Sequence, residues 1–260
     1  MTILQSLIMG VVEGLTEFLP ISSTAHLIFT GALLKIPSSE FLKSFEISIQ
    51  LGAILAVAII YFQRIIKNFS LVWKIAAAFI PTSIIGLALY KIVKTVLLES
   101  YLIIAISLIL GGIIIILFEK SYGKKIQTED KDNDLENITY KQAIKLGVIQ
   151  ALAIVPGVSR AGATIIGGLA LGIKRKAIVE FSFLLAIPTM LAATVLDIYK
   201  NPMVLSGSQL NVWLVGFVTS FITAIIGVKF LIKYVQKNNF IAFGWYRIIL
   251  GLIVLGVILL

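Results

Sequence analysis

The sequence contains no cysteine and only one histidine in 260 residues. The missing thiols exclude disulfides, cysteine nucleophiles and zinc sites built on sulfur, and a single imidazole excludes a polyhistidine metal site. A metal bound by this protein must therefore be held by carboxylates, which suit hard cations such as Mg²⁺ or Ca²⁺.

Charge is also scarce. Only 13% of the residues are charged, against about 25% in an average soluble domain, while 59% are hydrophobic and the mean hydropathy is +1.04. These values exclude a soluble enzyme, a secreted domain and a disordered chain, and they predict an integral membrane protein. The net charge of +9 is explained by basic cytoplasmic loops, so no nucleic-acid partner is expected.

Six apolar stretches are each long enough to cross a bilayer, which takes about 20 residues. They lie near 45–62, 69–90, 101–118, 177–196, 212–232 and 242–260. The regions 2–36 and 142–172 are also apolar, but proline and small polar residues interrupt each near its middle. Each interrupted region predicts two short helices rather than one span.

The hydrophilic segment 119–141 predicts a solvated cytoplasmic loop that joins two halves, about 1–118 and 142–260, of a single membrane domain covering 1–260. The halves resemble one another: GVVEGLTEFLPISSTAH begins at Gly10 and GVIQALAIVPGVSRAGAT at Gly147. With one residue of slip after the first few positions, Ser23 pairs with Ser159. This weak symmetry predicts an internal duplication.

Basic residues predict the orientation. If both interrupted regions are re-entrant, fourteen Lys and Arg residues lie on one side of the membrane, and five lie on the other: Lys35, Lys43, Lys91, Lys94 and Lys200. The richer side is then cytoplasmic, and both termini lie outside. The predicted fold class is an all-α polytopic membrane protein with six transmembrane helices and two re-entrant helix-loop-helix pairs, arranged as an inverted-topology repeat.

The first interrupted region concentrates ionisable residues. Glu13 and Glu17 are four residues apart, so they share one helix face, and charges in membrane segments are expensive and generally functional. Pro20 is expected to end that helix. Ser22 or Ser23 would cap the next helix, with His26 in its first turn, where either hydroxyl can approach the imidazole. Exposed N–H groups at such a helix start bind anions.

The second interrupted region supplies a cation. Pro156 and Gly157 are expected to break the helix, Ser159 to cap its continuation, and Arg160 to lie near the membrane centre. The planar guanidinium matches phosphate oxygens, although an ion pair with a glutamate is an alternative.

Arg247 is interpreted as an interfacial anchor and the run 174–176 as a topology signal. Together the two regions predict handling of a membrane-presented phosphate, by a phosphatase or by a carrier.

The motifs EGLTEFLPISSTAH and PGVSRAGAT closely resemble those of the undecaprenyl-diphosphatase family, the bacitracin-resistance type of polyprenyl pyrophosphate phosphatase, along essentially the whole chain. The resemblance implies hydrolysis of undecaprenyl diphosphate to the monophosphate and inorganic phosphate, which recycles the lipid carrier for peptidoglycan synthesis. It also implies a divalent cation, a plasma-membrane location, the fold described above, and an active site open to the extracytoplasmic side.

The same resemblance assigns roles by motif position. Glu13 and Glu17 are the acidic pair, implicated in metal binding and catalysis. Ser23 is the favoured nucleophile, with His26 as the second candidate. Ser159 and Arg160 bind the diphosphate, with Ser22 and Thr24 close by.

Two positions depart from the family pattern. Ala25 stands where the first motif usually has glycine, and Ala161 where the second often has serine, which removes one phosphate donor. The alternative function is a transporter or flippase for a polyprenyl phosphate lipid. The sequence leaves open the nucleophile, the metal, the prenyl length and a homodimer.

Overall fold

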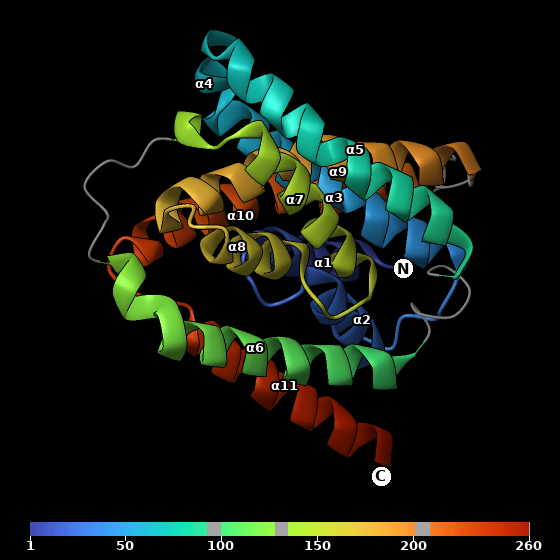
Figure 1. Cartoon of the computed structure of the whole chain (residues 1–260). Helices are drawn as coiled ribbons and strands as arrows, with labels where there is room; N and C mark the ends of the chain where they lie inside the picture. The colour runs from blue at the N-terminus through green and yellow to red at the C-terminus, as the bar shows by residue number, and fades with distance from the viewer. Residues whose placement is uncertain (93–99, 128–134, 201–208, 260) are drawn as a thin grey trace. The chain divides into compact units, whose positions relative to one another are not determined.

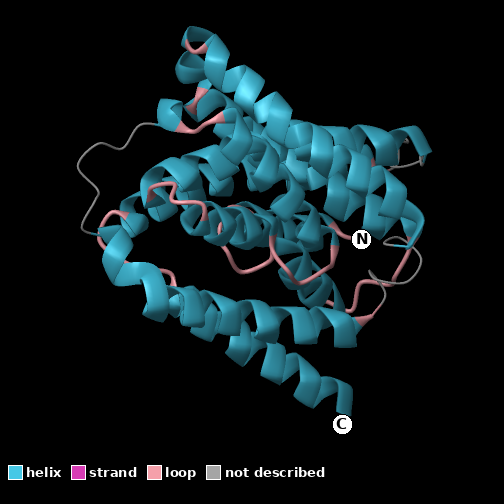
Figure 2. Cartoon of the chain, in the orientation of Figure 1, coloured by secondary structure: helices cyan, strands magenta, loops and turns pink. Residues whose placement is uncertain are grey.

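The computed structural model describes residues 1–92, 100–127, 135–200 and 209–259, and every regular element within these ranges is a helix (Figure 1, Figure 2). Six of the described helices are long and apolar enough to span a membrane, which confirms the predicted multi-pass membrane protein. They are α3 (Glu40–Ile60), α5 (Phe69–Ile92), α6 (Tyr101–Gln127), α9 (Arg175–Lys200), α10 (Leu210–Val235) and α11 (Ile241–Leu259).

Each interrupted region forms two short helices, as predicted. The first contains α1 (Ile3–Thr16) and α2 (Ser23–Leu33), and the second contains α7 (Tyr140–Gln150) and α8 (Arg160–Ala170). Helices of 11 to 14 residues are about 17–21 Å long at 1.5 Å per residue. The hydrocarbon core is about 30 Å thick, so none of these helices can cross it alone.

The helices α1 and α7 begin in the same way. A capping box joins Thr2 to Gln5 at the start of α1, and another joins Thr139 to Gln142 at the start of α7. Each threonine hydroxyl accepts the glutamine N–H, and each glutamine side chain accepts the threonine N–H. Both pairs satisfy helix N–H groups that otherwise lack partners.

The breaks and the ends of the second helices also match, at a constant separation of 137 residues. Ser22 (φ 71°) and Ser159 (φ 73°) precede α2 and α8, and Lys35 (φ 53°) and Gly172 (φ 78°) follow them. The sequence pairing of Ser23 with Ser159 was wrong by one residue, because the left-handed backbone that starts the second helix lies at Ser22. Backbone conformation, rather than serine identity, sets this register.

The predicted loop 119–141 is shorter than expected. The helix α6 continues to Gln127, a short 3₁₀ helix forms at Leu135–Asn137, and Leu135 is buried. Residues 128–134, with most of the predicted loop acids and Lys131, lie outside the described residues, as does Lys94.

The chain packs as two compact units. The first comprises Met1–Leu19, Ser23–Lys67 and Ala186–Leu231, and the second comprises Pro20–Ser22, Asn68–Leu185 and Ile232–Leu260. In the first unit, a Cβ at Gly10 of α1 would lie 2.6 Å from the Gly216 carbonyl oxygen of α10. In the second, a Cβ at Gly147 of α7 would lie 1.9 Å from the Ala78 carbonyl oxygen of α5. Glycine is required at both positions because the helix backbones touch.

Gly157 is the glycine whose replacement is expected to cost most in the second break. Its φ is 91°, and an added Cβ would lie 2.6 Å from the Ile104 carbonyl oxygen of α6. We expect Gly157→Ala to lower the free energy of unfolding in detergent by at least about 2 kcal/mol. Gly172→Ala is the matched control, because Gly172 also has a positive φ but open space around it. It should cost only about 1 kcal/mol, and equal losses would contradict the backbone clash.

Candidate active site

The two predicted carboxylates lie together at the end of α1. Glu17 caps this helix, and its N–H donates to the Glu13 carbonyl oxygen at 2.9 Å. Both side chains are buried, at 0% exposure for Glu13 and 6% for Glu17. The helix ends at Thr16, before Pro20, so the prediction that Pro20 itself ends it was wrong by a few residues. The i, i+4 relation of the carboxylates is nevertheless kept.

Ser23 is the hydroxyl that reaches this acidic pair. It is the first residue of α2, it is buried, and its Oγ donates a hydrogen bond to Glu17 Oε2. The sequence placed the serine hydroxyls near an imidazole and did not predict this bond. A carboxylate that accepts a hydroxyl hydrogen bond is placed to receive that proton. The bond therefore joins a candidate nucleophile to a candidate base.

The remaining residues of the first motif lie close along the chain. His26 lies in the first turn of α2, as predicted, and is half-buried, as is Thr24. Ala25, the departure from the family pattern, is fully buried. Ser22 is buried directly before α2. These placements put hydroxyl and imidazole groups at the N-terminal turn of a helix, where anions are favoured.

The second motif forms the start of α8. Ser159 is its N-cap, as predicted, and its Oγ accepts the Gly162 N–H at 3.0 Å. Arg160 is the first helical residue, and its Nη1 donates to the carbonyl oxygen of Ser182 at 2.8 Å and to Ser182 Oγ at 3.3 Å. The Oγ1 of Thr164 lies 2.6 Å from Ser182 Oγ. Ser182 of α9 thus holds one side of the guanidinium, and Thr164 of α8 contacts the Ser182 hydroxyl.

Arg247 was wrongly predicted to be an interfacial anchor. Its side chain is completely buried on α11, and its guanidinium donates only to backbone carbonyl oxygens in the bonds described here. The acceptors belong to Pro20, Ser107, Leu108, Gly157 and Val158. The one hint of this burial in the sequence is a pair of glycines in an uncharged span, Gly111 and Gly112. They leave room for the guanidinium, since a Cβ at Gly111 would lie 2.1 Å from Arg247 Nη2.

Arg175 also has a role that the basic run 174–176 did not predict. It is buried, and its guanidinium forms a bidentate ion pair with Glu119 of α6 and lies 5.0 Å from the Phe240 ring centroid. Glu119 also accepts the Phe240 N–H at 3.1 Å. Glu119 is therefore a buried helical residue rather than part of a solvated loop.

The structure brings together some predicted residues within each unit. Glu17 and Ser23 are hydrogen-bonded in the first unit, and the break at Pro20 meets the break at Gly157–Val158 through Arg247 in the second. A phosphate shared by Glu17 and Arg160 remains a prediction, because these two residues belong to different units.

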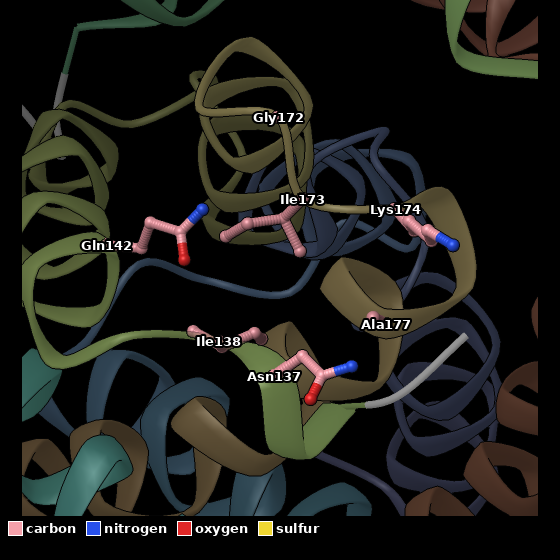
Figure 3. Close-up of a pocket in the computed structure, with 7 residues that line it drawn as sticks. All are labelled: Asn137, Ile138, Gln142, Gly172, Ile173, Lys174 and Ala177. Carbon is pink, nitrogen blue, oxygen red and sulfur yellow. The ribbon is translucent and has the colours of Figure 1, made fainter. Parts of the chain in front are cut away.

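A surface pocket has none of the predicted site residues in its lining (Figure 3). It is lined by Asn137, Ile138, Gln142, Gly172, Ile173, Lys174 and Ala177. Gln142 already donates to the Leu171 carbonyl oxygen at 3.1 Å, as Gln5 does to Leu34 at the same distance in the first half. The amide therefore serves helix packing rather than a ligand.

The fold and these residues define a multi-pass helical membrane protein with buried acidic, hydroxyl and guanidinium groups at two helix breaks. A sequence model of the family described as bacitracin resistance protein BacA matches residues 6–253. The chain belongs to this family. It is 49% identical to an undecaprenyl-diphosphatase of Aquifex aeolicus over 97% of both chains, and 51% identical to one of Wolinella succinogenes over 98% of both. It is 48% identical to an undecaprenyl-diphosphatase of Sulfurihydrogenibium, over 97% of this chain and 98% of the relative.

Proposed function

We propose that this protein hydrolyses undecaprenyl diphosphate to undecaprenyl phosphate and inorganic phosphate, and so recycles the lipid carrier for cell-wall glycan synthesis. Relatives that match it along nearly their whole length carry the name of this activity. The structural observation that carries the proposal is the hydrogen bond from Ser23 to Glu17 inside a membrane protein. A buried hydroxyl joined to a carboxylate is the arrangement that nucleophilic catalysis needs.

In the proposed reaction, Ser23 Oγ attacks the terminal phosphorus, and its proton passes to Glu17. The bond from that phosphorus to the bridging oxygen breaks, and undecaprenyl phosphate leaves with the bond's electron pair. Water then hydrolyses the phosphoserine, which releases inorganic phosphate and restores the serine hydroxyl. His26, in the first turn of the same helix, is the second candidate nucleophile.

Arg160 and the helix starts are proposed to bind the phosphate oxygens. Arginine offers two parallel donors to a phosphate, and Ser182 holds one of its nitrogens in place. Ser159 would contact the diphosphate beside Arg160, and Ser22 and Thr24 would do so from the start of α2. Such pre-oriented donors stabilise charge that grows in the transition state.

Glu13 and Glu17 are proposed to hold the divalent cation, Mg²⁺ or Ca²⁺. Both offer oxygen, and Mg²⁺ in phosphate chemistry commonly uses one or two carboxylates plus substrate oxygens. Over the described ranges, no group of three or more His, Asp or Glu side chains forms a cage made of protein alone. The donor set therefore fits a cation whose shell the diphosphate completes. When bound, the cation would neutralise phosphate charge.

The two broken helix pairs are proposed to be re-entrant and inverted. Their short helices cannot cross the hydrocarbon core alone, and their matched caps and breaks support a common architecture. Together with the bias of basic residues, this arrangement would place both termini outside the plasma membrane and open the active site to the extracytoplasmic side.

Cation dependence of phosphate release tests the proposed activity. Purified protein would be assayed in detergent with C55 and C15 prenyl diphosphates. Removal of divalent cations by a chelator is expected to lower the rate at least about 100-fold, and Mg²⁺ or Ca²⁺ should restore it. Full activity in chelator would contradict the cation site. If folded protein released no phosphate but moved labelled polyprenyl phosphate across liposomes, the transporter alternative would replace the enzyme.

A further inference from the structure

We propose that Arg247 is a positioning residue that fixes both helix breaks of the active site, an inference that rests on the proposed phosphatase function. Its Nη1 donates to the Pro20 carbonyl oxygen at 3.2 Å and to the Val158 carbonyl oxygen at 2.9 Å. One nitrogen therefore holds the chain just before Ser22 and Ser23 together with the chain just before Ser159 and Arg160.

The other two nitrogens of the guanidinium connect the breaks to the spanning helix α6. Nη2 donates to Gly157 at 2.8 Å and to Ser107 at 3.1 Å, and Nε donates to Leu108 at 3.4 Å, all at carbonyl oxygens. A guanidinium has five N–H groups, and these five bonds use all of them. No N–H remains for a phosphate oxygen, so Arg247 acts through the breaks and does not bind substrate.

The breaks need such a donor for a physical reason. Where a helix is interrupted at membrane depth, its freed carbonyl groups have no water to bond, and each unsatisfied group costs free energy. Arg247 satisfies the Pro20, Gly157 and Val158 carbonyls at once. Because the side chain is fully buried, its charge is stabilised only if these dipoles stay in place. The guanidinium and the two breaks thus hold one another in a single geometry.

Space for the guanidinium is built into the surrounding helices. A Cβ at Gly111 of α6 would lie 2.1 Å from Nη2, and one at Gly162 of α8 would lie 3.3 Å from Nη1. Gly111→Ala should therefore displace the guanidinium without removing its charge. Gly256 lies on α11, the helix of Arg247, with nothing within 4 Å of an added Cβ, and it provides the matched control.

The test uses the absence of native cysteine. Ile21→Cys places one thiol in the first break, where Ile21 is 6% exposed. In this background, Arg247→Lys and Gly111→Ala are expected to raise the maleimide labelling rate at least about tenfold. Both should lower kcat at least about 100-fold, because small displacements of reacting groups are that costly. The KM should stay within about threefold, because the prenyl chain still binds.

Arg175→Lys and Gly256→Ala, in the same background, are the controls. Their maleimide labelling rate and their kcat per folded protein should stay within about threefold of those of the Ile21→Cys protein. Arg175 is equally buried but bonds Glu119 rather than a break. Wild-type labelling and kcat in folded Arg247→Lys and Gly111→Ala would overturn the proposal. If neither variant folds, Arg247 serves folding and the positioning role is likewise overturned. If the Ile21→Cys protein itself releases no phosphate, the proposed phosphatase function fails. The labelling rates then still test whether Arg247 fixes the two breaks.

Discussion

Glu17→Gln is expected to lower kcat for phosphate release at least about 1,000-fold, because it removes the carboxylate that is proposed to act as general base and as cation ligand. Glutamine has the same shape as glutamate, and its side-chain oxygen can still accept the hydrogen bond from Ser23. The variant should therefore fold and keep the bond, but the amide cannot take up the hydroxyl proton. Steady-state phosphate release from purified, monodisperse protein measures the effect.

Ser23→Ala, and the double variant that combines it with Glu17→Gln, test whether the two residues act together. If Ser23 and Glu17 act as one unit, the double variant should be no slower than the worse single variant, since effects within a unit are not additive. Glu40→Gln is the matched control, because Glu40 is exposed at the start of α3 and pairs only with its neighbour Lys43 among the ion pairs described. Additive losses, or equal losses in Glu40→Gln, would rule out the Ser23–Glu17 unit.

Arg160→Lys is expected to lower kcat about 100- to 1,000-fold, the usual loss when a donor to a developing oxyanion is removed. Lysine keeps the charge but cannot bond Ser182 and present a planar fork to phosphate at the same time. Ser182→Ala should cause a smaller loss of about tenfold, since it removes the hydroxyl acceptor of Nη1 and leaves the bond to the backbone carbonyl oxygen of residue 182. Phosphate release at saturating lipid diphosphate measures both variants.

Ser220→Ala is the control for the buried hydroxyl. Ser220 is as buried as Ser182, but its Oγ has no hydrogen-bond partner in the part of the chain that the structure describes. Its removal should leave kcat within about twofold of wild type. Wild-type activity in Arg160→Lys would show that charge alone suffices and that the fork geometry has no role.

Local patterns in the sequence were enough to predict the helices. Stretches of about 20 apolar residues can satisfy their backbone in lipid only as helices, which is why α3, α5, α6, α9, α10 and α11 were found. The breaks near Pro20 and Gly157 were predicted because proline or glycine stands beside small polar residues there, whereas Pro81 and Pro188 lie inside the continuous helices α5 and α9. The cap at Ser159 was predicted because capping involves residues only three apart.

Partners that do not share one helix were not predictable in this way. The bond from Ser23 to Glu17 depends on how the chain turns between Thr16 and Ser22. The burial of Arg247, far along the chain from Pro20 and Val158, depends on how α6 and α11 pack. The ion pair of Arg175 was not predicted for the same reason, because its partner Glu119 lies 56 residues away.

The sequence by itself determined the class of protein, its spanning helices and the residues that carry ionisable groups, because these follow from composition and from spacing within one helix. Only the tertiary structure showed that Arg247 holds the backbone at the breaks, while a phosphate-binding role is proposed for Arg160. An arginine in an apolar stretch has the same local pattern in either role. Its role depends on whether its five N–H groups are already used, and that is settled by carbonyl groups that packing brings from distant segments.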